Sequence, residues 1–229
     1  MRHPEDDHRR FEERREFERP VWEQGYSRVA GVDEAGRGPL AGPVVAAAVV
    51  LPRDLYIPGL DDSKKLTPAA RERLYGVVVE KASAYAVGVC GVEEIDLHNI
   101  YQATVMAMEQ AVRQLAPPPD YVITDAVRLP RLSIPQWAVV DGDALCNCVA
   151  AASIIAKVTR DRIMAAIDRE FPAYGFARHK GYATPEHLDA LRRLGPCPHH
   201  RTSFHWQSEQ ELLPQESLPG VESGGAGKK

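Results

Sequence analysis

The most restrictive feature of this sequence is a pair of short apolar runs separated by a segment rich in glycine and proline. Residues 28–33 and 44–51 consist mainly of β-branched and small apolar side chains, which are typical of strands. The segment between them contains Gly36, Gly38 and two prolines, residue types that form turns and interrupt regular structure. We therefore predict two strands that pair like a hairpin.

The remainder of the chain alternates between strand and helix patterns. A threonine followed by proline, a favourable helix start, occurs twice. The expected elements are helices that begin at Thr67 and at Thr184 and lie within residues 97–115 and 143–171, and strands at residues 85–90, 121–124 and 137–140. Strands in succession, followed by strands alternating with helices, predict a mixed sheet flanked by helices.

The chain has 229 residues, of which 44% are hydrophobic and 26% charged, a composition typical of a globular protein rather than a disordered or fibrous one. Residues 1–20 are dense in Arg and Glu and are expected to form a charged arm, either disordered or helical. Residues 209–229 are rich in glycine, serine and proline and are expected to form a flexible tail. The folded domain is therefore expected at residues 21–208.

Neither a secretory leader nor a membrane span is expected. The amino-terminal residues are highly charged, and the longest apolar run, residues 44–51, is far shorter than the ~20 residues of a spanning helix. We therefore expect a cytoplasmic protein whose four cysteines are reduced. Cys146 and Cys148 do not have the usual spacing of a zinc knuckle and are expected to pack within a helix.

Acidic side chains follow three of the predicted strands. Asp33 and Glu34 end the first strand, and Asp125 and Asp143 follow strands later in the chain. A single acid at such a position is most often a solvated cap, but three strand ends can meet at one edge of a sheet. Carboxylates without His or Cys among them suit Mg²⁺ or Mn²⁺, and two such ions can hydrolyse a phosphodiester. These four acids therefore predict a divalent-metal site.

The net charge of −4 provides no overall positive field, so a nucleic-acid partner would require a local basic surface. Residues 157–201 contain nine Lys or Arg against five Asp or Glu. Such a run is often the solvated face of a helix, but here it is the candidate phosphate-binding surface. The basic residues are Lys157, Arg160, Arg162, Arg169, Arg178, Lys180, Arg192, Arg193 and Arg201.

The residues alone leave two other functions to consider. The pattern Gly36-x-Gly38 after a strand could open a dinucleotide-binding motif, but that motif requires a helix to begin there. The sequence instead gives Pro39, Pro43 and an apolar strand. The alternative function is a non-catalytic nucleic-acid-binding module, although four acids would repel the phosphates that it must bind.

Residues 31–43, Gly-Val-Asp-Glu-Ala-Gly-Arg-Gly-Pro-Leu-Ala-Gly-Pro, resemble the signature of ribonuclease HII, the type 2 ribonuclease H family. The segment at residues 62–66, Asp-Ser-Lys-Lys-Leu, resembles the family's phosphate-contacting segment. Further matching blocks follow in the family's order at residues 150–161, 174–176, 179–182 and 200–204. The resemblance covers about residues 28–204. Ribonuclease HIII, the nearest alternative family with the same fold, would require a longer amino-terminal domain.

The resemblance implies a ribonuclease H-like α/β fold, a five-stranded mixed sheet flanked by helices with a helical C-terminal part. It implies cleavage of the RNA strand of RNA–DNA hybrids and incision 5′ of single ribonucleotides in duplex DNA, by two-metal-ion hydrolysis that leaves 5′-phosphate and 3′-hydroxyl ends. The implied catalytic and metal-binding residues are Asp33, Glu34, Asp125 and Asp143. The implied substrate-binding residues are Gly36, Arg37, Gly38, Lys64 and Tyr182.

The chemistry of these residues agrees with the resemblance. Gly36 and Gly38 let the main chain approach a sugar closely, and the ring of Tyr182 can stack beside it. The chain departs from the family at Ala126, where relatives usually have glycine, and at Asp141, which would share a face with Asp143 if the last strand continued. We expect a monomer that binds hybrids and ribonucleotide-containing DNA and no membrane. The C-terminal tail could carry a sliding-clamp contact, which the sequence does not support.

Overall fold

The computed structural model describes residues 4–206, so the tail predicted at residues 209–229 lies outside the described residues. The strands are β1 (Val29–Ala35), β2 (Val44–Val50), β3 (Ala84–Cys90), β4 (Tyr121–Asp125) and β5 (Gln136–Val139). The helices are α1 (Pro4–Glu23), α2 (Pro68–Lys81), α3 (Val92–Arg113), α4 (Gly142–Leu145), α5 (Asn147–Glu170), α6 (Phe176–His179) and α7 (Pro185–Leu194), with short 3-10 helices η1 (Ser63–Lys65) and η2 (Pro172–Tyr174).

The strands form one sheet in the order β3-β2-β1-β4-β5. β1 pairs antiparallel with β2, as the predicted hairpin requires, and β2 pairs antiparallel with β3. β1 is parallel to β4, and β4 is parallel to β5. The predicted five-stranded mixed sheet is therefore confirmed, and the central strand β1 and its neighbour β2 are largely buried.

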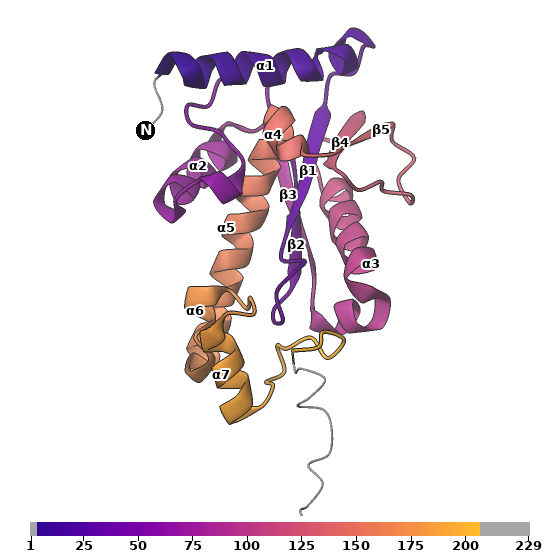
Figure 1. Ribbon diagram of the computed structural model, residues 1–229. Helices are drawn as coiled ribbons and strands as arrows, with labels where there is room; N and C mark the ends of the chain where they lie inside the picture. Colours follow the sequence, from indigo (N-terminus) through magenta and orange to yellow (C-terminus); the bar gives the residue numbers. More distant parts are fainter. Residues whose placement is uncertain (1–3, 207–229) are drawn as a thin grey trace, which may run out of the picture.

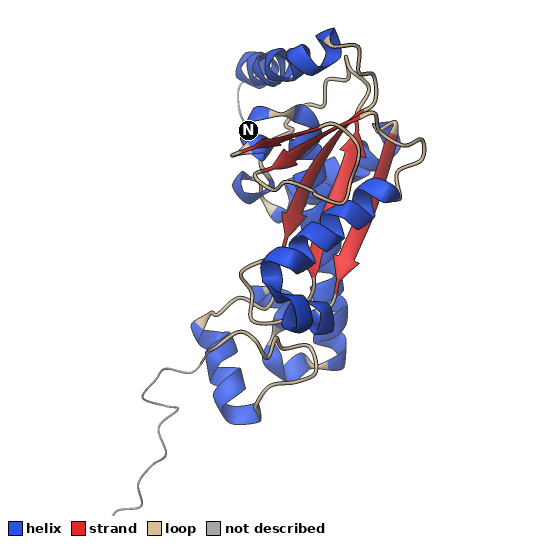
Figure 2. Cartoon of the chain, turned by 90° about the vertical axis from the view of Figure 1, so that its right-hand side faces the viewer, coloured by secondary structure: helices blue, strands red, loops and turns tan. Residues whose placement is uncertain are grey.

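Helices cover both faces of the sheet (Figure 2). Val32 on β1 belongs to a buried cluster with Met108 on α3, whereas Ala47 on β2 belongs to a cluster with Ile154 on α5. α2 packs in the second cluster beside α5. A strand buried on both faces is a continuous apolar run, which accounts for the Val- and Ala-rich sequence of β2.

Two glycines allow the helices to approach the sheet. A Cβ atom at Gly31 on β1 would lie 2.1 Å from the main-chain carbon of Cys148, at the start of α5. On the other face, a Cβ at Gly88 on β3 would lie 2.0 Å from the carbonyl oxygen of Ala107 on α3. Any larger residue at either position would push a helix away from the sheet.

The charged amino-terminal segment is a helix packed on the domain. α1 lies across the end of the molecule beside α4 and the start of α5 (Figure 1). Phe11, Arg14, Glu18 and Val21 are buried, and the helix continues through Pro20 to Glu23. These four residues recur every three or four positions and so share one face. Asp7 and Arg10 flank that face and also bind the domain, through Tyr56 and Asp61. A helix is one of the two forms expected for residues 1–20, but this helix packs on the domain instead of forming a solvated arm.

The C-terminal helices pack on the end of α5. α6, α7 and η2 form a buried cluster with α5, which accounts for the predicted helical C-terminal part. Both predicted helix starts are confirmed, because the hydroxyls of Thr67 and Thr184 accept hydrogen bonds from the amides of Ala70 and His187. None of the described helices has the combined length and apolar character that a membrane span requires.

Replacing Gly31 by alanine is expected to destabilise the protein by roughly 2–3 kcal/mol or more, because the new methyl group overlaps the main chain of α5. Gly76, which is exposed in the middle of α2 with open space around it, is the matched control. The same change there is expected to stabilise the protein by about 0.5–1 kcal/mol through helix propensity. Urea unfolding of both variants measures the two effects, and equal effects would contradict the close approach.

Candidate active site

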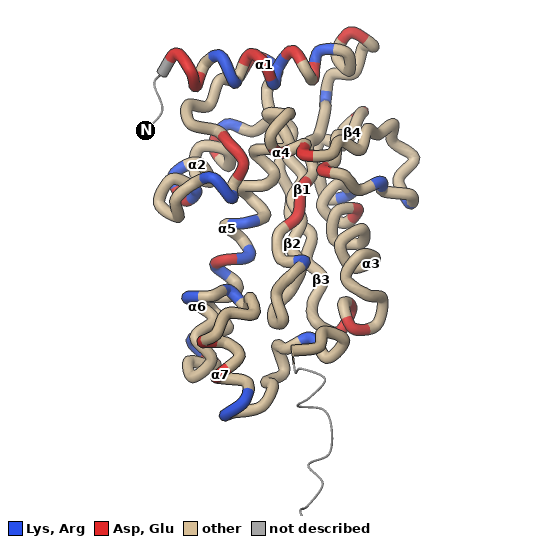
Figure 3. Tube along the Cα trace, viewed as in Figure 1, with Lys and Arg blue, Asp and Glu red and all other residues tan. Residues whose placement is uncertain are grey.

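The ends of three neighbouring segments place carboxylates beside one another. β1 and β4 are parallel, and Val32 pairs with Thr124, so Asp33 and Asp125 follow at the same level of the sheet. Asp143 reaches this point from the first turn of α4, which follows β5. One carboxylate oxygen from each of the three acids lies within 4.8 Å of the others. Figure 3 shows acidic residues gathered where β1, β4 and α4 meet.

Glu34 borders this three-acid cluster without being part of it. Arg37 donates a hydrogen bond to Oε1 of Glu34 at 3.3 Å. Oε2 of Glu34 is buried and has no hydrogen-bond partner within residues 4–206. A buried carboxylate oxygen without a partner is costly unless water or a cation satisfies it. This oxygen is therefore an acceptor that remains available to a bound group.

The site favours a bound cation. Burial, and after it the charges of Glu34 and Asp125, raise the pKa of Asp33 well above its usual value. Burial also raises the pKa of Asp143 and that of Glu34. Carboxylates this close together in a buried place need a proton or a cation to offset their charges. Because Mg²⁺ and Mn²⁺ prefer oxygen ligands, the residues present fit the predicted divalent-metal site.

The segment before α2 adds a lysine and a further acid. Nζ of Lys64 lies 3.4 Å from Oδ2 of Asp143. Burial lowers the pKa of Lys64, but the nearby acids together raise it above its usual value. The side chain of Asp62 is buried, accepts a hydrogen bond from the amide of Lys64 at 2.9 Å, and interacts with Asp143. The residue pattern does not identify Asp62 as a site residue, and its only signal in the sequence is its place in the block at residues 62–66.

Two buried arginines shape the loop between β1 and β2. Gly36 has a φ of 102°, and a Cβ there would lie 2.1 Å from Nε of Arg160. Arg201 donates hydrogen bonds to the carbonyl oxygens of Gly36 at 2.6 Å and Arg37 at 2.9 Å. Arg160 donates to two further carbonyls of the same loop, at 2.9 and 3.0 Å. The two guanidinium groups therefore fix the course of the predicted substrate-binding backbone.

Tyr182 lies against this loop. Its ring carbon Cε1 would be 3.8 Å from a Cβ atom at Gly38, and 44% of Tyr182 is exposed. The amide of Leu40 donates a hydrogen bond to the carbonyl of Gly181 at 2.8 Å, which joins the two segments. The structure thus brings together two residues predicted to bind substrate, Gly38 and Tyr182, with the aromatic ring open to solvent.

Two buried histidines support the backbone of Tyr182. Nδ1 of His187 lies 3.0 Å from the carbonyl oxygen of Tyr182, and its Nε2 lies 3.0 Å from Nε2 of His200. Because a carbonyl oxygen only accepts, we assign the proton of His187 to Nδ1, so that His200 donates to Nε2 of His187. Burial, and after it the charge of His187, lower the pKa of His200 to about 4. His200 is therefore neutral near pH 7.

A groove of about 620 Å³ lies between α2, α5 and α6 and is bordered by Tyr182. Basic residues from the surface predicted above line it, namely Lys157, Arg162, Arg178 and Lys180. Arg160 and Arg201 were also predicted there, but they are only 1% and 2% exposed and bind main-chain carbonyls. The prediction was wrong for these two arginines, because residue spacing does not reveal that a long side chain is directed inward.

The residue after Asp125 occupies a strained turn. Ala126 has a φ of 55°, and the amide of Val127 donates to the carbonyl of Asp125 at 2.7 Å, which closes a three-residue turn. A positive φ favours glycine, the residue that the resemblance leads us to expect at this position. Asp125 nevertheless keeps its place, because its Oδ1 accepts a hydrogen bond from the amide of Gly142 at 2.9 Å.

Asp141 does not share a strand face with Asp143. β5 ends at Val139, and Asp141 is exposed with a φ of 58° immediately before α4. The left-handed residue turns the chain into the helix, so alternation along a strand no longer applies.

Cys146 and Cys148 are buried free thiols in the cluster that joins α5 to the sheet, as expected for packing residues.

Replacing Ala126 by glycine is expected to stabilise the protein by about 0.5–1 kcal/mol. The left-handed conformation costs an L-residue roughly 1–2 kcal/mol, and the greater chain entropy of glycine offsets part of the gain. Urea unfolding measures the change. A clear loss of stability would show that the turn does not have this conformation.

Protonation of His200 is expected to destabilise the fold as the pH falls. An unfolded histidine titrates near 6.5 and His200 in the folded protein near 4. The unfolded state therefore takes up the proton first, and the free energy of unfolding declines between these pH values by up to roughly 3 kcal/mol. Urea unfolding at pH 7, 6 and 5 would compare the protein with His200→Gln, whose amide can still donate to His187. Parallel pH dependence in both proteins would contradict this account.

Comparisons with known proteins match this architecture. Residues 30–207 match the model of the family described as Ribonuclease HII. Ribonuclease HII of Geobacillus kaustophilus is 55% identical over 195 residues, which cover 85% of this chain and 75% of that protein. Ribonuclease HII of Salinispora tropica is 54% identical over 190 residues, which cover 82% of this chain and 70% of that protein.

Solved structures have the same fold. The ribonuclease H2 from Pyrococcus horikoshii OT3 superposes with a TM-score of 0.66 and 30% identity, covering 78% of this chain and 94% of that one. The ribonuclease HII in the PCNA complex from Archaeoglobus fulgidus superposes with a TM-score of 0.63 and 26% identity, covering 83% of this chain and 98% of that one. Together with the sequence matches, this likeness means that the chain belongs to the ribonuclease HII family, the type 2 ribonuclease H endonucleases.

Proposed function

We propose that this chain hydrolyses the RNA strand of RNA–DNA hybrids and incises duplex DNA on the 5′ side of a single embedded ribonucleotide, leaving 5′-phosphate and 3′-hydroxyl ends. Family membership supports the endonuclease activity in general. The finer proposal is supported by one observation, which is that the three-acid cluster lies at the start of a loop whose glycines allow a sugar to approach the main chain.

Asp33, Asp125 and Asp143, with Glu34 beside them, would hold two divalent cations, Mg²⁺ or Mn²⁺. Such ions supply a water activated for attack on the phosphorus and offset the charge that develops on the leaving oxygen. The chain orients the ligand oxygens through its own amides. Glu34 donates its amide to Oδ1 of Asp33 at 2.7 Å, and Gly142 donates its amide to Asp125 at 2.9 Å.

Lys64 would contact the substrate at the edge of the site. Its ammonium group lies 3.4 Å from Asp143, while 73% of its side chain is exposed. A cation between a buried acid and solvent can attract a phosphate and draw the backbone of the substrate toward the ligands. The raised pKa of Lys64 keeps this charge present at neutral pH.

Gly36, Arg37 and Gly38 would recognise the ribose. A 2′-hydroxyl is both a donor and an acceptor, and it distinguishes RNA from DNA at a given position. Arg201 and Arg160 fix this loop through hydrogen bonds to its carbonyl groups on the protein side. The main-chain groups on its solvent side would therefore bind the sugar without a change in the loop. Tyr182 would pack on the same nucleotide, because its exposed ring lies beside Gly38.

The groove beyond Tyr182 would bind the nucleic-acid backbone. Its lining includes Lys157, Arg162, Arg178 and Lys180, although Lys157 and Arg162 also pair with acids of the protein. Figure 3 shows basic residues along α5 and in the region of α6 and α7. If this groove neutralises phosphates, the affinity for duplexes falls as salt concentration rises.

Two alternatives have less support. A non-catalytic nucleic-acid-binding module would gain nothing from an orphaned, buried carboxylate oxygen on Glu34 beside three acids. A dinucleotide-binding motif requires a helix after Gly38, whereas the chain continues into β2. A clamp partner has only indirect support, because the Archaeoglobus fulgidus relative was solved in a complex with PCNA.

The decisive measurement uses an end-labelled DNA duplex with one ribonucleotide and a matched all-DNA duplex. In Mg²⁺ or Mn²⁺ we expect cleavage 5′ of the ribonucleotide, and none of the DNA control or in chelator. Asp33→Asn should abolish cleavage while binding to the duplex, measured in chelator, persists. Tyr182→Ala should lower single-ribonucleotide incision by about 10-fold or more.

Tyr85→Ala is the control for Tyr182, because Tyr85 is 40% exposed on the edge strand β3. Its cleavage should equal that of the unmodified protein. Cleavage of long hybrids without cleavage at a single ribonucleotide would refute the proposed recognition by Gly36–Gly38 and Tyr182. Absence of cleavage on both substrates would instead favour the non-catalytic binding module.

A further inference from the structure

α1 precedes the residues that the family model matches, yet it contacts the elements that carry the candidate active site. The family model begins at residue 30, whereas α1 ends at Glu23. The helix nevertheless packs against α4, which carries Asp143, and against the start of α5 (Figure 1). A part of the chain beyond the family pattern therefore contacts an element that holds a candidate metal ligand.

The junction between α4 and α5 leaves main-chain groups that need partners. α4 is a single turn that ends at Leu145, α5 begins at Asn147, and Cys146 between them supplies no side-chain cap. Carbonyls at the end of one helix and amides at the start of the next lack intrahelical partners. The amide of Cys148 is one such group, and the carbonyl of Ala144 is another.

Residues of α1 satisfy both groups. Nε of Arg14 donates to the carbonyl of Ala144 at 2.9 Å, and the amide of Cys148 donates to Oε1 of Glu18 at 3.0 Å. Arg14 and Glu18 lie one helical turn apart, so one face of α1 provides both caps. The guanidinium group of Arg14 contacts the end of α4, and the carboxylate of Glu18 contacts the start of α5. A positive group at a helix end and a negative group at a helix start both interact favourably with the helix dipole.

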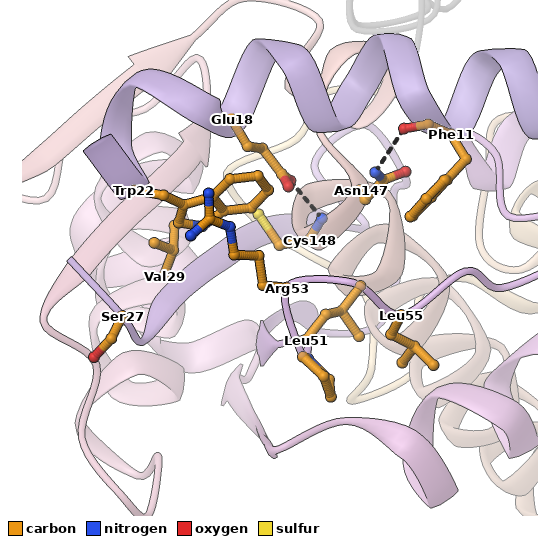
Figure 4. A pocket seen from close by; sticks show the side chains of 11 residues that line it. Phe11, Glu18, Trp22, Ser27, Val29, Leu51, Arg53, Leu55, Asn147 and Cys148 are labelled. Carbon is orange, nitrogen blue, oxygen red and sulfur yellow. Dashed lines mark hydrogen bonds between the residues drawn. The ribbon is translucent and has the colours of Figure 1, made fainter. Parts of the chain in front are cut away.

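A third contact comes from the same face. Nδ2 of Asn147 donates to the carbonyl oxygen of Phe11 at 3.1 Å. Figure 4 shows this bond and the bond between Glu18 and Cys148 under α1, beside a cavity of about 20 Å³. Phe11, Arg14 and Glu18 thus fix the first residues of α5 and the last turn of α4 together.

Arg14 also reaches the segment that carries Lys64. Its Nη1 donates to the carbonyl of Leu60 at 2.9 Å, and its Nη2 donates to Oδ1 of Asp61 at 2.9 Å. Arg14 and Asp61 are 3% and 1% exposed. Leu60 and Asp61 lie only a few residues before Lys64, which in turn contacts Asp143. One planar guanidinium group therefore bridges the two segments whose side chains meet in the site.

We propose that Arg14 is a positioning residue that holds Asp143 and Lys64 in their places by bridging α4 to residues 60–61. The inference rests on the proposed function for its effect on turnover. The number and direction of the hydrogen bonds of Arg14 matter more for this bridge than its charge. The rigid guanidinium group of arginine makes several directed hydrogen bonds, whereas lysine has a single nitrogen on a flexible side chain. Small displacements of reacting groups can reduce rates by up to about 100-fold.

The test compares Arg14→Lys with Arg9→Lys. Arg14→Lys keeps the charge beside buried Asp61 and so avoids an uncompensated buried acid. Arg9 is on the same helix, is 67% exposed and pairs with Asp6 and Glu13 of α1. Both variants are assayed at a temperature at which circular dichroism shows each to be folded. Arg14→Ala, assayed at the same temperature, removes the bridge entirely.

Two readouts distinguish positioning from general stability. On a long RNA–DNA hybrid at saturating Mn²⁺, Arg14→Lys should lower kcat by about 10-fold or more while KM changes by less than about twofold. Titration calorimetry with Mn²⁺ alone should show a dissociation constant raised about threefold or more, as loss of ligand support weakens metal sites. Arg14→Ala should lose at least as much, and Arg9→Lys should match the unmodified protein.

A folded Arg14→Lys or Arg14→Ala variant with unchanged kcat and unchanged Mn²⁺ affinity would overturn the inference. A change in KM alone would also overturn it, because that result would assign Arg14 to substrate binding. If the unmodified protein cleaves no substrate, the proposed function fails, and the Mn²⁺ titrations still decide whether Arg14 supports the metal ligands.

Discussion

The repulsion between buried acids at one end of the sheet is the constraint on which the surrounding structure depends. Asp33, Asp125 and Asp143 place carboxylate oxygens within 4.8 Å of one another, and burial raises the pKa of Asp33 and Asp143. Such a group of acids lowers the stability of the folded protein unless other contacts hold it. The largely exposed Lys64 offsets part of the negative charge through its contact with Asp143. Main-chain amides orient the carboxylates of Asp33 and Asp125. Under the proposed function, divalent cations held by the same acids would offset the rest of this repulsion.

Buried guanidinium groups provide much of that support, in two different ways. Arg160 and Arg201 bind main-chain carbonyls and give the loop after β1 its shape. Arg14 joins α4 to the segment before Lys64 and pairs with Asp61. In each case one planar side chain meets several acceptors that would otherwise be buried without partners. The site is thus held by contacts from three regions that are far apart in the sequence, α1, α5 and the segment after α7.

Much of the fold could be predicted because its signals are local. The apolar runs at β1 and β2, the Thr-Pro starts of α2 and α7, and the acids at strand ends are all visible along the sequence. The failures share a physical cause, since each depends on what the residue meets in three dimensions. Asp141 turns the chain with a positive φ instead of continuing β5. Arg160 and Arg201 are directed into the protein, and α1 packs through one face despite its overall charge.

The sequence by itself therefore determined the order of strands and helices, the acids available to a metal site and the family to which the chain belongs. Periodicity and motif spacing carry this information, because both are set by neighbouring residues. Only the tertiary structure decided that Asp62 borders the site, that Arg14 bridges two of its segments and that Glu18 caps α5. These contacts join residues 46 to 130 positions apart, and their partners are chosen by packing rather than by any local pattern.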